Sequence, residues 1–254
     1  MMEKIPPVRL LEESTPGDPS LDLAVSHALL RRVAAREAPA TVRLYRPGPT
    51  VAFGRLDALL DGFGDAIEAA RAHGFTPVLR SVGGHAAAYT SEAIVYEEIT
   101  PQERLAVEVR ERFEDVSGLL VAALVSLGAD ARVGEIPGEY CPGEFSVNAG
   151  GNVKLVGVAQ RVVARAALVS AVVVVRDGER VRAVLRDVNA RLGVEWEPRT
   201  AGALADVVPG VDVAAVRDAL VAHRARAVPL QPASLDADTL ALARELEERR
   251  RPSG

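Results

Sequence analysis

Residues 139–161 read EYCPGEFSVNAGGNVKLVGVAQR, and this central stretch predicts a β-hairpin that carries two unusual side chains. Phe145–Asn148 and Val153–Ala159 are strand-like, and the glycines and asparagine between them supply the positive φ angles that a hairpin turn needs. Cys141 is the only cysteine of the chain, and Lys154 is one of two lysines, although the chain has 30 basic residues. These two side chains are therefore the first candidates for chemistry.

Cys141 and Lys154 each allow two interpretations. Cys141 precedes Pro142-Gly143 and therefore lies in a rigid loop, where a thiol can act as a nucleophile if a nearby cation stabilises its thiolate. The alternative is a small buried apolar side chain, because free cysteine is among the most buried residue types. Lys154 lies between apolar residues and could hold a phosphate or carboxylate, or stabilise negative charge on an acyl oxygen. A lysine that faces solvent is the alternative, and the near absence of lysine elsewhere argues against it.

The composition excludes several classes of protein. With 48% hydrophobic residues among 254, the chain can bury a large core, which indicates one large domain or one domain with an appendage. A net charge of −5 provides no basic surface for nucleic acid. One cysteine and four scattered histidines do not form a zinc-ligand spacing. No apolar run approaches the roughly 20 residues of a membrane helix, and the N-terminus has no apolar signal core, so we expect a cytoplasmic protein without nucleic-acid or membrane partners.

A second feature is a loop with almost no side-chain volume, RSVGGHAAAYT at residues 80–90. Its adjacent glycines suit either the close approach of an apolar or phosphate-bearing ligand or a tight turn that needs positive φ. His85 in this loop could act as a base, although a histidine in a tight turn is more often structural. Upstream, the apolar run Thr50–Phe53 ends in Gly54-Arg55, where the glycine lets the backbone pass close to another group.

Hydrophobic periodicity and turn residues divide the chain into helices and strands. Helices are expected from Asp18-Pro19-Ser20 to about Glu37 and at Asp65–His73, Leu105–Leu127, Arg180–Leu192, Ala201–Val207, Val211–Arg226 and Ala237–Arg249. Besides the central hairpin, strands are expected at Thr41–Arg46 and Thr50–Phe53, joined across a turn, and at Thr76–Leu79, Ile94–Ile99, Ala131–Val133 and Leu168–Val175. Residues 1–17 are expected to be irregular. Several connections are too short for a crossover, so the sequence predicts an α+β fold with a mixed, largely antiparallel sheet.

Several parts of the chain resemble the lipoate-protein ligase and octanoyltransferase family. Lys154–Arg161, KLVGVAQR, is similar to that family's K-x-x-G-x-A-x-R signature. The loop at residues 80–90 resembles its R-x-x-G-G-G-A-V-x-H-D segment, and Thr50–Arg55 resembles its strand that ends in Gly-Arg. The first helix and the strand after it follow the family's order. The resemblance covers residues 18–192.

The resemblance implies a fold shared with biotin-protein ligases, with a catalytic domain over residues 1–192 and a helical C-terminal extension over residues 193–254. It also implies transfer of a lipoyl or octanoyl group to a lysine of a lipoyl carrier domain. In the family, the motif lysine contacts the acyl carbonyl or the acyl-adenylate phosphate, a role that falls on Lys154. Some branches use a cysteine shortly before this motif as an acyl-thioester nucleophile, and Cys141 matches that placement. The expected substrate-binding residues are Arg80, Gly83, Gly84, His85, Ala86, Gly54, Arg55, Gly157 and Ala159.

Three hypotheses about function are open at this point. The preferred one is an acyltransferase that carries the chain on Cys141 and needs no cofactor. The second is a lipoate-protein ligase that uses ATP and Mg²⁺ and passes through lipoyl-AMP. The third is a non-catalytic protein that binds an acyl ligand or a lipoyl domain. The expected partner is a lipoyl carrier domain or a glycine-cleavage H-type protein, with acyl carrier protein as a possible donor. In the loop, His85 and Tyr89-Thr90 replace the family's third glycine and His-Asp pair, so ATP dependence stays open.

Overall fold

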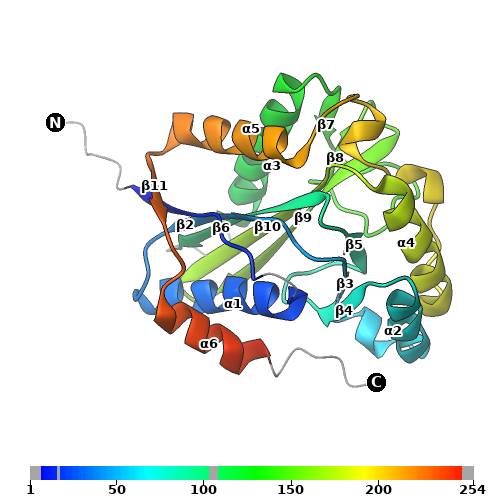
Figure 1. The fold of residues 1–254 in the computed structure, drawn as a ribbon, viewed down its shortest axis with the longest axis horizontal. Coiled ribbons are helices and arrows are strands. Elements are labelled where there is room, and N and C mark those ends of the chain that lie inside the picture. The colour runs from blue at the N-terminus through cyan, green and yellow to red at the C-terminus, as the bar shows by residue number, and fades with distance from the viewer. Residues whose placement is uncertain (1–6, 16–17, 103–107, 248–254) are drawn as a thin grey trace.

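The computed structural model describes residues 7–15, 18–102 and 108–247. An eight-stranded sheet forms the centre of the molecule, with helices on both faces (Figure 1). Its strands, in spatial order, are β11 (Leu230–Ala233), β1 (Val8–Leu11), β2 (Thr41–Tyr45), β6 (Ala93–Pro101), β10 (Ala166–Val174), β9 (Val153–Val163), β8 (Val147–Ala149) and β7 (Ala131–Val133). The strands β11, β1 and β2 pair in parallel, and every later neighbour pairs antiparallel. This order confirms the predicted mixed, largely antiparallel sheet.

Two pairs of helices cover the faces of this sheet. The helices α1 (Pro19–Ala35) and α6 (Ala237–Glu247) lie on one face, and α3 (Glu108–Ser126) and α5 (Val213–Ala227) lie on the other (Figure 1). The α1 helix begins as predicted, because the Asp18 carboxylate accepts a hydrogen bond from the Leu21 amide at 3.0 Å. No helix in the described ranges is long and apolar enough to cross a membrane. The predicted location in the cytoplasm stays a prediction.

A smaller sheet of three strands stands beside the large one. Its order is β4 (Thr76–Leu79), β3 (Thr50–Phe53) and β5 (Ala87–Tyr89). The helices α2 (Phe63–Ala72) and α4 (Gly178–Leu192) pack with it in one apolar cluster. Short 3₁₀ helices occupy connections, namely η1 (Asp57–Leu59), η2 (Pro198–Thr200) and η3 (Leu204–Asp206). Because the chain passes from β4 through residues 80–86 into β5, this small sheet holds the glycine loop in place.

Two local predictions were wrong. The strands β2 and β3 were expected to pair across Pro47-Gly48-Pro49, but β2 pairs with β1 and β6, and β3 pairs with β4 and β5. Two prolines have fixed φ angles and no N–H donors, so this connection leads the chain from one sheet to the other instead of closing a hairpin. The helix expected at Ala201–Val207 contains only the 3₁₀ turn η3. Gly202 and the nearby Pro209 both disfavour a longer helix there.

The segment before α1 is more ordered than the sequence predicted. Val8–Leu11 forms β1, which lies between β2 and β11. The strand β11 was also missed, because four residues that include Pro232 show no strand alternation. The boundary at residue 192 stays a prediction, although one core cluster contains Leu44 before it and Leu220 after it. The first residues expected for α3 and the last expected for α6 lie outside the described ranges.

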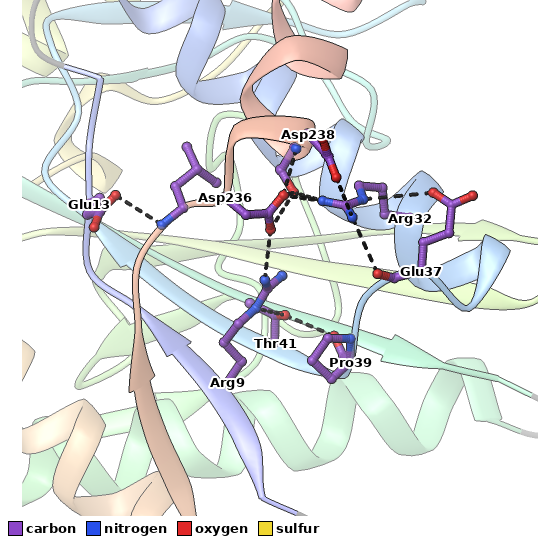
Figure 2. A network of polar contacts seen from close by, with 10 residues as sticks. Arg9, Glu13, Arg32, Glu37, Pro39, Thr41, Asp236 and Asp238 are labelled. Atoms are coloured by element: carbon purple, nitrogen blue, oxygen red, sulfur yellow. Dashed lines mark hydrogen bonds and ion pairs between the residues drawn. The ribbon is translucent and has the colours of Figure 1, made fainter.

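Asp236 fastens the C-terminal part of the chain to this edge of the sheet. Its carboxylate caps α6 by accepting a hydrogen bond from the Thr239 amide at 2.8 Å, and it also pairs with Arg9 at 3.2 Å and with Arg32 (Figure 2). Burial acts to raise the pKa of Asp236, but the hydrogen bonds from Thr239 and Arg32 outweigh it and lower this pKa to about 2. One carboxylate therefore links α6 to both β1 and α1.

Candidate active site

A cavity of about 280 Å³ lies between the glycine loop, the cysteine loop and the large sheet. Its volume is close to the lower end of the roughly 300–1,000 Å³ typical of small-molecule sites. Seven of the residues predicted for the site line this cavity, namely Arg80, Gly83, Gly84, Cys141, Lys154, Gly157 and Ala159. The fold thus brings together two loops and a strand that are far apart in the sequence, and it places both candidates for chemistry in one cavity.

The floor of the cavity is a row of side chains that crosses four strands of the large sheet. Gly157 on β9 is opposite Val172 on β10, which is opposite Val95 on β6, which is opposite Tyr45 on β2. Three strand spacings make this row about 14 Å long. Glycine and valine leave an open apolar surface between Lys154 at one end and the Tyr45 ring at the other. An extended acyl chain fits such a floor.

Tyr45 forms a rigid end to this row. Its ring packs on the Arg43 guanidinium, whose central carbon is 3.9 Å from the ring centroid. Arg43 is buried and pairs with Asp22 at 2.8 Å and with Glu97 at 3.5 Å. Burial raises the pKa of Tyr45, with a further contribution from the Glu97 carboxylate, so the phenol stays neutral. Because its partners are themselves fixed, Tyr45 limits the depth of the cavity.

The Cys141 thiol lies next to a cation from the glycine loop. The Arg80 guanidinium donates one hydrogen bond to Cys141 Sγ at 3.3 Å and one to the His85 carbonyl oxygen at 2.6 Å. Gly84 is essential to this approach, since a Cβ built there would be 2.6 Å from Sγ and 2.5 Å from the guanidinium. Cys141 itself has a φ of 48°, an uncommon value outside glycine. The half-buried thiol is therefore presented to the cavity by a constrained turn.

Lys154 is buried, with 2% of its surface exposed, and it binds the cysteine loop. Its ammonium donates to Glu139 Oε1 at 2.9 Å, to the Tyr140 carbonyl at 3.1 Å and to the Cys141 carbonyl at 2.7 Å. An ammonium group has three N–H donors, so these contacts use all of them. In this arrangement Lys154 holds the loop that carries the thiol, and a contact with an acyl oxygen requires the exchange of one acceptor.

Glu139 is the residue of the site that the sequence analysis missed. Its side chain is fully buried, and besides Lys154 it accepts hydrogen bonds from the amides of Ile136 and Gly143 and from the Ser146 hydroxyl at 2.7 Å. It therefore sets the shape of the loop on both sides of Cys141. A single glutamate in a loop is no motif, and its place two residues before the cysteine was the only available signal.

Four predicted residues lie outside the cavity. Gly54 packs closely against the backbone of the glycine loop, because a Cβ there would be 1.8 Å from the Gly84 carbonyl oxygen. His85 Nδ1 is 2.8 Å from Asp57 Oδ1, and Asp57 also accepts a hydrogen bond from the Gly54 amide, so Asp57 orients the His85 ring. Ala86 is buried in the cluster of the small sheet, and Arg55 lines a second, separate pocket. In the part of the chain that the structure describes, no three His, Cys, Asp or Glu side chains are arranged to hold a metal.

Comparison with known proteins identifies relatives over most of the chain. Residues 18–225 match the family model described as lipoyl protein ligase A/B catalytic domain. An octanoyl-[GcvH]:protein N-octanoyltransferase of Geobacillus kaustophilus is 32% identical over 209 residues, which are 81% of this chain and 73% of the relative. A lipoyl-[GcvH]:protein N-lipoyltransferase of Listeria monocytogenes is 28% identical over 60% of this chain and 56% of its own length.

Solved structures share the whole architecture. Lipoate-protein ligase A bound with ATP superposes with a TM-score of 0.78 at 21% identity, covering 96% of this chain and 95% of that one. The bipartite lipoate protein ligase of Thermoplasma acidophilum superposes with a TM-score of 0.73 at 21% identity over 96% of this chain and 92% of its own. At this level of identity the likeness concerns the fold, and it confirms the lipoate-protein-ligase-like architecture predicted from the sequence.

Proposed function

The chain belongs to the family of the lipoyl protein ligase A/B catalytic domain, and from this premise we propose that it transfers an octanoyl or lipoyl group to a lysine of a carrier protein through a thioester on Cys141. The curated relatives are transferases named for the octanoyl or lipoyl form of GcvH. A carrier of this type is therefore the proposed partner. The observation that carries the proposal is the contact of 3.3 Å between Arg80 and the Cys141 thiol at one end of an apolar cavity.

The first half-reaction loads the enzyme. The Cys141 thiolate attacks the carbonyl carbon of the acyl donor, so that a C–S bond forms and negative charge moves to the carbonyl oxygen. When this intermediate collapses, the bond from the carbonyl carbon to the donor's nitrogen breaks. That nitrogen leaves as an amine after it takes up one proton through solvent, which balances the proton that the Cys141 thiol lost when it formed the thiolate. A donor that is itself a thioester loses its sulfur in the same way. The acyl chain remains on Cys141, with its hydrocarbon part along the row that ends at Tyr45.

The second half-reaction delivers the chain. The neutral amine of the acceptor lysine attacks the thioester carbonyl, a C–N bond forms, and the C–S bond breaks to return the thiolate. The nitrogen then loses its additional proton, which gives a neutral amide. In both steps Arg80 stabilises the sulfur when it carries negative charge. Lys154 stabilises the carbonyl oxygen after it exchanges the Cys141 carbonyl for this acceptor.

The alternative function is an ATP-dependent ligase, and one specific observation supports it. Lipoate-protein ligase A, which shares this architecture, has been solved with ATP bound. In that reaction Lys154 would hold the phosphate of an acyl-adenylate. The curated relatives favour the transferase, which requires no cofactor, because their names describe transfer from an acylated protein.

Intact-mass measurement separates these functions. After incubation with an octanoylated GcvH-type protein, we expect one octanoyl adduct on the chain, which hydroxylamine removes and which Cys141→Ser abolishes. Cys141 is the only cysteine, so a hydroxylamine-labile adduct identifies the residue. Octanoyl acyl carrier protein serves as a second donor, and lipoate with ATP and Mg²⁺ tests the ligase. AMP release without an adduct would contradict the thioester mechanism.

A further inference from the structure

A second pocket of about 260 Å³ lies on the other side of the glycine loop and is lined by basic side chains. Its cations come from three separate parts of the chain, Arg31 on α1, Arg55 after β3 and Arg161 on β9. Arg80 lines both this pocket and the cavity of Cys141. Four arginines thus meet at this pocket, although the chain has a net charge of −5.

Within the described residues, no ion pair joins Arg31, Arg55 or Arg161 to a carboxylate. The Nε–H groups of Arg80 and Arg161 are buried and have no acceptor there. Burial lowers the pKa of Arg161, and the nearby charges of Arg55 and Arg31 lower it further. The pocket thus has the donors and the charge to receive a carboxylate in the paired geometry that arginine favours.

An apolar surface adjoins the basic pocket. Ala58 of η1 lines the pocket, and its neighbours Leu56 and Leu59 are 60% and 79% exposed, which is unusual for large apolar side chains. Asp57 anchors this turn, because its carboxylate accepts a hydrogen bond from the Gly54 amide and also contacts His85 Nδ1. Exposed apolar side chains that are bordered by polar residues mark protein-interaction sites, and arginine is enriched in protein interfaces. A free inorganic anion would gain no binding energy from these apolar leucine side chains, whereas a protein ligand would.

We propose that η1 and this arginine pocket form the docking surface for the carrier protein, with a carboxylate side chain of the carrier entering between Arg31, Arg55 and Arg161. The inference rests on the proposed function, because a carrier must bring its lysine to Cys141. Ser81 lines the pocket and Gly83 lines the thiol cavity, so a protein bound on this surface reaches the cavity across one short loop. Arg161 is tied to that loop by a hydrogen bond of 2.8 Å to the Ser81 carbonyl.

The decisive variant is Arg31→Glu, which reverses one exposed charge of the pocket. Arg186→Glu on α4 is the matched control, because it makes the same charge change at an exposed arginine outside both pockets. We expect the KM for the octanoylated carrier to rise roughly tenfold in Arg31→Glu with little change in kcat, and not in the control. Between about 20 and 200 mM NaCl, the KM of the unmodified protein rises steeply, whereas that of Arg31→Glu rises less steeply. Leu59→Ser, which alters no charge, raises KM and keeps the steep salt dependence.

Three further measurements separate carrier docking from a damaged active site and from a free-anion site. Acylation of Cys141 by a small octanoyl thioester needs no docking, so its loss in Arg31→Glu would mean a damaged site and overturn the proposal. Competitive inhibition of carrier transfer by millimolar inorganic phosphate that Arg31→Glu abolishes, with unchanged carrier affinity, would indicate a free-anion site and also overturn it. Direct binding of the non-acylated carrier to the unmodified protein and to Arg31→Glu tests docking even if no thioester forms. The failure of the docking surface is thereby distinguishable from the failure of the proposed chemistry.

Discussion

Lys154 explains at the residue scale why a chain so rich in arginine keeps a lysine at its centre. Three acceptors, the Glu139 carboxylate and the carbonyls of Tyr140 and Cys141, converge on its ammonium from different directions. A compact ammonium can satisfy three such acceptors, whereas a planar guanidinium fork presents five donors in one plane and would leave some of them unpaired in this buried position. The same contacts hold the cysteine loop, so the lysine and the thiol form one structural unit.

Gly84→Ala tests how the glycine loop admits the thiol. Gly84 has a φ of +92°, and a Cβ there would collide with both Cys141 Sγ and Arg80. We therefore expect a loss of stability on the order of 2 kcal/mol and slower octanoyl loading of Cys141, measured by thermal unfolding and by intact mass. Gly83→Ala is the stability control, because no heavy atom lies within 4 Å of a Cβ at that position and its φ is ordinary. Equal melting temperatures for the two variants would contradict the steric explanation.

At the scale of elements, the site depends on how four strands of the large sheet are aligned. The register places Gly157, Val172, Val95 and Tyr45 in one row, although they come from β9, β10, β6 and β2. Residues that are directly opposite each other on paired strands lie on the same face of the sheet, so these four positions form one surface. The cavity floor is thus a property of strand pairing, and no single strand contains it.

Tyr45→Ala tests whether the end of this row limits the acyl chain. Removal of the ring lengthens the cavity, so we expect the ratio of kcat/KM for a dodecanoyl donor to that for an octanoyl donor to rise roughly tenfold. Tyr45→Phe keeps the ring over Arg43 and serves as the control, with a ratio close to that of the unmodified protein. An unchanged ratio in Tyr45→Ala would show that the chain does not extend as far as β2.

At the scale of the whole molecule, the two ends of the described chain close the fold together. The strands β1 and β11 pair in parallel at one edge of the sheet, and Asp236 connects the start of α6 to Arg9 and Arg32 (Figure 2). The helix α6 in turn packs on α1, whose residue Arg31 belongs to the basic pocket. The C-terminal elements therefore support the face on which we place carrier docking.

The Asp236→Asn variant tests whether Asp236 stabilises the folded protein more at neutral pH than at pH 2. The pKa of Asp236 is lowered from 3.8 to about 2 in the folded protein, so its contribution is present above about pH 4 and is lost as pH falls toward 2. We expect a lower melting temperature for Asp236→Asn at pH 7 and a difference that shrinks progressively between pH 4 and pH 2. Asp238→Asn is the control, because the Asp238 side chain is 87% exposed and its closest approach to Arg32, 3.8 Å, is longer than a hydrogen bond. A difference that stays constant down to pH 2 would contradict this assignment.

The sequence by itself determined the long helices, the central hairpin and the identity of the two candidates for chemistry. Periodicity specifies α1 and α3, the Asp18 cap specifies the start of α1, and turn residues specify the central hairpin, because all of these depend on neighbouring residues. The rarity of Cys141 and Lys154 is visible without a structure. The resemblance placed the glycine loop and the lysine motif in one site, and both line the cavity.

Only the tertiary structure decided which strands pair and which charges meet. The separation of β2 from β3, the edge pair β1 and β11, the role of Glu139 and the basic pocket all join residues that are distant in the chain. Strand pairing and charge burial depend on residues that are distant in the chain but close in space. Patterns among neighbouring residues do not identify these distant residues. The thiol, its cation and its acyl floor therefore become one site only when both sheets are assembled.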